Sequence, residues 1–153
     1  FHIIVHAVTK PMLFSAAGGL ASASGHKYHF DQLEGAAHRN PIAGVAFVIG
    51  SLSMIGIPFF SGFGAKYYLS MAAMTNPGKM WFTMIALAVS TVLNAMYYIR
   101  AIRNIYLKTD DIAPRPVSKS YNLGMGVFIV ANVLLGLFYQ HIVAIIDLGL
   151  KFL

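Results

Sequence analysis

Three long stretches of the chain carry no Asp, Glu, Lys or Arg; they are Ile42–Ala65, Met80–Ile99 and Ser120–Ile146. Each has at least the roughly 20 residues that a helix needs to cross the hydrocarbon core of a bilayer. A fourth apolar stretch runs from Phe1 to about Ala23, and only Lys10 interrupts it. Because lipid offers no partners to an open strand, these stretches are expected to be helices. The sequence therefore predicts one all-α domain, a polytopic transmembrane bundle with about four spans at about 1–23, 41–74, 80–107 and 120–150.

Basic residues gather on two of the predicted loops. Seven of them lie in loops 24–40 and 100–119, and they are Lys27, Arg39, Arg100, Arg103, Lys108, Arg115 and Lys119. The opposite side carries only Lys79 and Lys151. By the positive-inside rule, both basic loops are predicted to be cytoplasmic. The net charge of +6 is then explained by topology, so lipid is an expected partner and nucleic acid is not.

The second predicted span is too long for one straight helix. From Pro41 to about Met74 it would measure about 50 Å at about 1.5 Å per residue, against a core of about 30 Å. Pro58 removes a helical hydrogen bond, and the glycines around it, Gly62 among them, accept backbone angles that other residues avoid. The sequence therefore predicts a broken helix, which in transporters is a pointer to an ion site.

Three ionisable residues recur every four positions in the first span: His2, His6 and Lys10. This spacing places them on one stripe of a helix. Lys10 lies some 20 Å from the predicted helix end near Ala23, which is too deep for its ammonium to reach the surface. We therefore expect it to face a protein-lined or hydrated interior, and the three groups to form a proton relay. The alternative is a structural helix interface held by hydrogen bonds.

Lys66 has two interpretations from the sequence alone. In a continuous second span it would fall near the outer surface, and Tyr67 and Tyr68 would form part of an aromatic belt. The overlong span and its predicted break favour instead a deeper lysine that follows a half-helix.

Other kinds of site find little support. The loop histidines His26, His29 and His38 lie near Asp31 and Glu34, but their spacing does not match a structural zinc site. The chain has no cysteine, which excludes disulfides and thiolate-bound clusters within it. We expect no metal, no cofactor, and no redox or hydrolytic site of its own.

Two ordered motifs resemble a known family. The run Phe1-His2-x-x-x-His6-Ala7-x-x-Lys10 resembles the His/Lys helix of antiporter-like subunits, and Gly56-Ile57-Pro58-x-x-x-Gly62-Phe63-x-x-Lys66 resembles their broken helix. These subunits belong to the membrane arm of respiratory complex I (NADH:quinone oxidoreductase), to membrane-bound hydrogenases and to Mrp-type Na+/H+ antiporters. The segments Leu33–Gly35, Arg39–Pro41 and Asn94–Arg100 fit as well, so the resemblance covers essentially the whole chain.

The resemblance implies a 14-helix fold with two inverted repeats, of which this chain would be roughly the last four helices. The lysine that matches Lys66 exchanges protons at the outlet of the second half-channel, and the residues that match Lys10, His6 and His2 carry the axis between half-channels. The remaining helices would lie upstream in the same protein or in a companion chain. The expected partners are other membrane subunits of a complex in the inner (plasma) membrane of a prokaryote. The chain alone would not be a complete pump.

Two departures from the family pattern stand out: Phe59 replaces a second proline after Pro58, and Pro11 replaces a small residue. Neither removes an ionisable group. The predicted function is a proton-translocating subunit of a complex I-like, hydrogenase-like or Mrp-type assembly. The alternatives are sodium or potassium exchange for protons in an Mrp-type antiporter, a purely structural membrane subunit, and a membrane anchor for a redox module.

Overall fold

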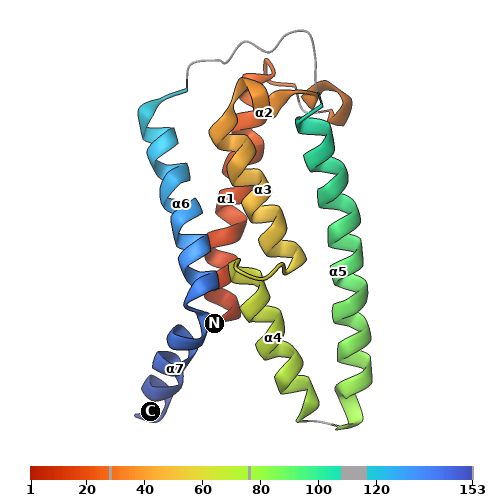
Figure 1. Cartoon of the computed structure of the whole chain (residues 1–153), viewed down its shortest axis with the longest axis vertical. Coiled ribbons are helices and arrows are strands. Elements are labelled where there is room, and N and C mark those ends of the chain that lie inside the picture. Colours follow the sequence, from red (N-terminus) through yellow and green to blue (C-terminus); the bar gives the residue numbers. More distant parts are fainter. Residues whose placement is uncertain (28, 76, 108–116, 153) are drawn as a thin grey trace.

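The computed structural model describes residues 1–27, 29–75, 77–107 and 117–152, and it is a bundle of helices (Figure 1). The elements are α1 (His2–Ala23), a 3₁₀ turn η1 (Phe30–Leu33), α2 (Ala36–Arg39), α3 (Pro41–Ile55), α4 (Ser61–Met74), α5 (Pro77–Ile105), α6 (Lys119–Leu137) and α7 (Tyr139–Leu150). Among the helices described, α1, α5 and α6 are long and apolar enough to cross a membrane. The predicted fold class, a polytopic all-α bundle, is confirmed.

The second span is broken into α3 and α4, as its length requires. Asn40 caps the start of α3, because its side-chain oxygen accepts a hydrogen bond from the Ala43 N–H at 3.3 Å. Pro41 follows at the first helical position, where its missing N–H costs little. The helix ends at Gly56, whose φ of +92° lies in the left-handed region that glycine adopts without strain.

The segment between the two half-helices runs from 56 to 60 and contains Pro58. Gly62 lies in the first turn of α4, where a Cβ would collide with the carbonyl oxygen of Ser53 on α3. Phe59 has a φ of +77°, which a proline ring, fixed near −65°, cannot adopt. The absence of a second proline at this position therefore has a conformational reason.

The fourth segment differs from the single helix expected over about 120–150. The structure divides it at Phe138 into α6 and α7. The division lies where α6 passes the α3–α4 break: a Cβ on Gly136 would collide with the carbonyl oxygen of Phe59, and the Tyr139 ring covers the backbone of Gly64. The second interruption is thus a product of tertiary contact, since no proline marks it in the sequence.

Figure 1 shows both termini in the half of the bundle where α4 meets α5, the C-terminus near its end and the N-terminus level with the junction of α6 and α7. The short helix α2 and the ends of α1 and α5 that lie near it are at the opposite end, which carries the predicted basic loops. This arrangement agrees with an even number of crossings. Lys108 and Arg115 of the predicted cytoplasmic loop lie outside the described residues, and the sidedness of the loops stays a prediction.

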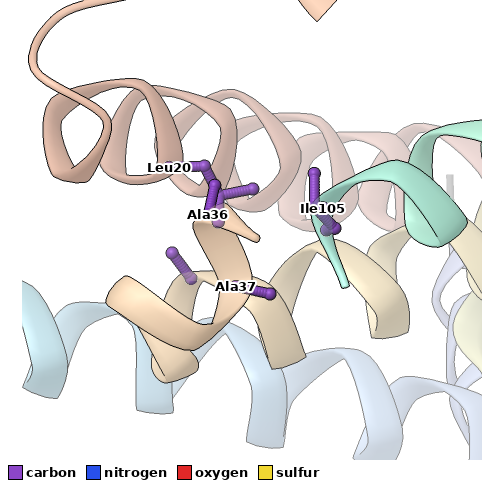
Figure 2. Packing of buried hydrophobic residues seen from close by; sticks show 5 residues of the cluster. Leu20, Ala36, Ala37 and Ile105 are labelled. Carbon is purple, nitrogen blue, oxygen red and sulfur yellow. The ribbon is translucent and has the colours of Figure 1, made fainter. Parts of the chain in front are cut away.

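Small residues let the helices approach closely at the basic end. Leu20 of α1, Ala36 and Ala37 of α2, and Ile105 of α5 form a buried cluster, which Figure 2 shows. Buried Arg39 closes the loop beside it by donating hydrogen bonds to Ser24 Oγ at 3.0 Å and to the Glu34 carbonyl oxygen at 2.7 Å. This packing fixes α1, α3 and α5 against one another, and the candidate site lies between them.

Candidate functional site

The Lys66 side chain reaches back from α4 across the helix break. Its Nζ donates hydrogen bonds to the Ile55 carbonyl oxygen at 2.8 Å and to Thr91 Oγ1 at 2.7 Å. Ile55 is the last residue of α3, so its carbonyl lies at the negative end of the helix dipole. Thr91 Oγ1 donates its own proton to the Leu87 carbonyl oxygen at 2.8 Å and is therefore an acceptor toward Lys66. The two acceptors suit an ammonium group.

Gly56 makes room for this lysine. A Cβ at position 56 would lie 2.8 Å from Cδ of Lys66 and 3.3 Å from its Cε. The glycine thus has two roles: it adopts the positive φ that ends α3, and its missing Cβ leaves space for the methylene groups of Lys66.

Thr91 gives the depth of the Lys66 ammonium. It is the central residue of α5, which runs over 29 residues from Pro77 to Ile105. At about 1.5 Å per residue, either end of α5 is about 21 Å away. The head group therefore lies level with the middle of the longest candidate span, whereas an interfacial anchor would lie near its end. Tyr68 packs edge-on against Tyr139 of α7, with ring centroids 6.0 Å apart.

A cavity of about 150 Å³ lies beside Lys66, between α1, α3, α4 and α5. Its polar lining comes from His2, His6, Ser53, Lys66, Ser90 and Asn94. Because one water molecule needs only about 10–15 Å³ of cavity volume, the cavity has room for several water molecules. The structure therefore brings Lys66 together with two of the three ionisable residues of α1.

The two histidines lie against each other at the α1 wall of this cavity. Their rings are arranged edge to face, with centroids 4.3 Å apart. Nδ1 of His6 is buried and has no hydrogen-bond partner within the part of the chain that the structure describes. The polar capacity of this ring nitrogen is therefore unused within the described residues, although the His6 side chain lines the cavity.

Lys10 lines a different cavity, of about 270 Å³, between α1, α3 and α5. Its side chain is exposed on this chain. Met54 of α3 lines both cavities and so stands between the Lys10 cavity and the Lys66 cavity. The structure thus places the His2–His6–Lys10 stripe along two neighbouring compartments.

A buried chain of hydroxyl and amide groups crosses the bundle next to Lys66. Asn132 Nδ2 of α6 donates to Thr9 Oγ1 of α1 at 2.9 Å, and Thr9 Oγ1 lies 3.3 Å from Ser61 Oγ of α4. Ser61 Oγ lies 2.9 Å from Ser53 Oγ of α3, which accepts a hydrogen bond from the Gly62 N–H at 3.0 Å. The four side chains are at most 1% exposed.

Sequence reasoning identified the ionisable groups but missed the neutral ones that hold them, namely Thr91, Thr9, Ser53 and Ser61. The sequence does contain a signal for these residues, since each carries a hydroxyl inside an apolar segment, where hydroxyl groups form hydrogen bonds to neighbouring helices. Asn132 carries the same signal, as an amide inside an apolar segment, and it bonds to Thr9 of α1. Among the described residues, no group of three or more His, Asp or Glu side chains is placed to hold a metal ion.

These features agree with a comparison to known families. A family model described as "NADH:quinone oxidoreductase/Mrp antiporter, TM" matches residues 1–94. The chain belongs to this family. The match includes the α1 histidines and Lys10, the broken helix and Lys66, so the whole Lys66 cavity lies inside it.

Individual members of the antiporter family are also similar to the chain. NADH-quinone oxidoreductase subunit N of Desulforudis audaxviator is 38% identical over 70% of the chain, and that of Anaeromyxobacter sp. is 30% identical over 93%. A Staphylococcus epidermidis protein that carries the name of an antiporter subunit, mnhD2, is 36% identical over 63%. The chain spans 21%, 29% and 19% of the length of these three relatives. No solved structure matches the chain significantly.

Proposed function

We propose that this chain forms part of an antiporter-like membrane subunit and that it moves protons through Lys66. The observation that carries the proposal is the setting of the Lys66 ammonium. It lies level with the middle of α5, and both of its hydrogen-bond partners are neutral. An ionisable group at membrane depth is costly to keep, and such groups mark ion and proton pathways. Lysine, unlike arginine, can give up its proton.

The hydrogen bonds at Lys66 allow one proton to be exchanged without moving the side chain. An ammonium has three N–H groups, and two of them go to the Ile55 carbonyl and to Thr91 Oγ1. The third is left for water in the cavity. After that proton leaves, the amine keeps both bonds and turns its lone pair to the cavity, from which it can be protonated again.

His2 and His6 are the next proton carriers on this route, because they line the same cavity. A histidine can carry a proton on either ring nitrogen, so it can take a proton at one and release it from the other. Lys10 follows on α1, and water would have to pass Met54 to reach it. The proposed order is therefore Lys66, the two histidines and then Lys10, in either direction.

The partners follow from the family. The relatives are named as subunits, so we propose that further membrane subunits and further helices, in this protein or in another chain, cover the exposed face of α1. The basic loops are proposed to face the cytoplasm of a prokaryotic cell. Since the relatives include both NADH-quinone oxidoreductase and antiporter subunits, the carried ion is tested as H+ first and Na+ second.

The test is Lys66→Met in the assembled complex, in inverted membrane vesicles that contain a fluorescent pH probe. We expect most of the proton translocation to be lost while assembly is normal. Lys79→Met is the matched control, because Lys79 is exposed in the first turn of α5 and should leave the rate unchanged. Normal pumping by Lys66→Met would overturn the proposal. A loss confined to sodium-containing buffer would favour Na+ exchange.

A further inference from the structure

The two half-helices α3 and α4 must keep one relative position for Lys66 to reach the Ile55 carbonyl. That carbonyl is on α3 and the lysine is on α4, so the distance between them depends on how the two half-helices are joined. Only residues 56–60 connect them along the chain. The buried hydroxyl chain described above joins them a second time, through space.

We propose that Ser53, Ser61, Thr9 and Asn132 form a staple that positions Lys66 opposite the α1 histidines. This inference rests on the proposed function, since it assigns positioning residues to the same site. Ser53 links α3 to α4 in the staple, because its Oγ accepts the Gly62 N–H and bonds to Ser61 Oγ. Ser53 lies two residues before Ile55, and Ser61 lies five residues before Lys66, so the staple sets the distance between the lysine and its carbonyl.

Thr9 connects the staple to α1 and therefore to the histidines. Its Oγ1 bonds to Ser61 Oγ at 3.3 Å and accepts from Asn132 at 2.9 Å. His6 lies three residues before Thr9, less than one helical turn away. Fixing Thr9 against α4 thus fixes the face of α1 that His2 and His6 present to the Lys66 cavity.

The number of hydroxyl hydrogens determines which groups in the staple donate and which accept. Its three hydroxyls supply three hydrogens for two hydroxyl-to-hydroxyl bonds, since N–H groups of Asn132 and Gly62 are the donors at the two ends. One hydroxyl hydrogen is therefore left over. Both Thr9 and Ser53 are buried, but only Ser53 lines the Lys66 cavity, so an unpaired hydrogen would be costly at Thr9 and could be donated to water at Ser53. Ser53 thereby presents a donor to the cavity beside Lys66.

The staple has a matched control on the same helix. Ser51 is also fully buried on α3, but its Oγ donates to the Phe47 carbonyl of its own helix, at 2.6 Å, and within the described residues it joins no other helix. Ser51→Ala and Ser53→Ala therefore remove the same group at the same burial and differ in whether α3 loses its link to α4.

The experiment compares Thr9→Val, Thr9→Ser, Ser53→Ala and Ser51→Ala in the assembled complex. Initial rates of proton translocation are measured across a range of pH and expressed per assembled complex. We expect Thr9→Val and Ser53→Ala to lower the rate about fivefold, which corresponds to about 1 kcal/mol, and to shift the pH profile. Thr9→Ser keeps the hydroxyl and should restore both rate and profile, and Ser51→Ala should change neither.

Three results would overturn the staple. The first is a Thr9→Val variant whose rate and pH profile equal those of Thr9→Ser, and the second is a Ser51→Ala variant as impaired as Ser53→Ala. The third is a Thr9→Val variant that fails to assemble where Thr9→Ser assembles, because the hydroxyl would then be required for folding. Lys66→Met separates this failure from that of the proposed function. If Lys66→Met abolishes translocation and the staple variants do not alter it, only the staple is wrong.

Discussion

Replacing Thr91 with valine tests how Lys66 holds its proton. The substitution keeps the shape of the side chain and removes the acceptor that lies 2.7 Å from the Lys66 Nζ. The Leu87 carbonyl, which also loses a bond from Thr91, is already part of the α5 helix and should be little affected. The effect should therefore be concentrated on Lys66.

The size of the effect follows from the two protonation states. A hydrogen bond to a charged group is worth about 1.5–3 kcal/mol and one to a neutral group about 0.5–1.5 kcal/mol. Losing the Thr91 acceptor thus disfavours the ammonium over the amine by about 1 kcal/mol. At about 1.4 kcal/mol per pH unit, the alkaline limit of translocation should move about 0.7 unit toward lower pH.

The assay is the initial rate of vesicle acidification, measured from neutral to alkaline pH for the wild type, Thr91→Val and Thr91→Ser. Serine retains the hydroxyl, so its profile should overlay that of the wild type. The reasoning is refuted if Thr91→Val leaves the profile in place, or if Thr91→Ser shifts it as far as valine does.

Three further changes test the neighbouring features. Gly56→Ala should reduce both assembly and translocation, because Gly56 has a φ of +92° and a Cβ there would lie 2.8 Å from Cδ of Lys66. Gly124→Ala is the control, since a Cβ at position 124 has no atom within 4 Å. Equal effects of the two variants in a gel-based assembly assay would contradict this expectation. Phe59→Gly should stabilise the protein by about 1 kcal/mol, because a non-glycine residue at a φ of +77° is strained, and Phe59→Pro should destabilise it. Thermal denaturation in detergent measures both, and the opposite order of stability would contradict the strain at Phe59. Met54→Ala should join the two cavities and speed the collapse of an imposed pH gradient, whereas Met54→Leu should not; an unchanged leak would show that Met54 is no barrier.

The parts of the fold that depend on local sequence could be predicted. The break at Pro58 has a proline and glycines at the place where the span is too long, and both facts are visible in the sequence. The break at Phe138 has no proline, and the one glycine near it, Gly136, lies inside α6. It arises where Gly136 accommodates the loop carbonyl of Phe59, a contact between residues far apart in the chain.

The same distinction applies to the site. Helical periodicity placed His2, His6 and Lys10 on one stripe, but successive members turn by about 40°, so Lys10 is about 80° around α1 from His2. That rotation is enough for it to line a second cavity. The depth of Lys66 stayed open because its ammonium reaches back to α3 and α5, and only three-dimensional contacts show this.

The contact between the two helix breaks has a mechanical consequence. Tyr139 rests on the backbone of Gly64, so a change in the angle of α4 near Lys66 would push on the first residue of α7. In Figure 1, α7 diverges from the bundle below this point. With Phe138 as a pivot, the 12 residues of α7 form a lever arm about 18 Å long at about 1.5 Å per residue. A small rearrangement at the lysine would then appear, amplified, as a swing at the far end of α7.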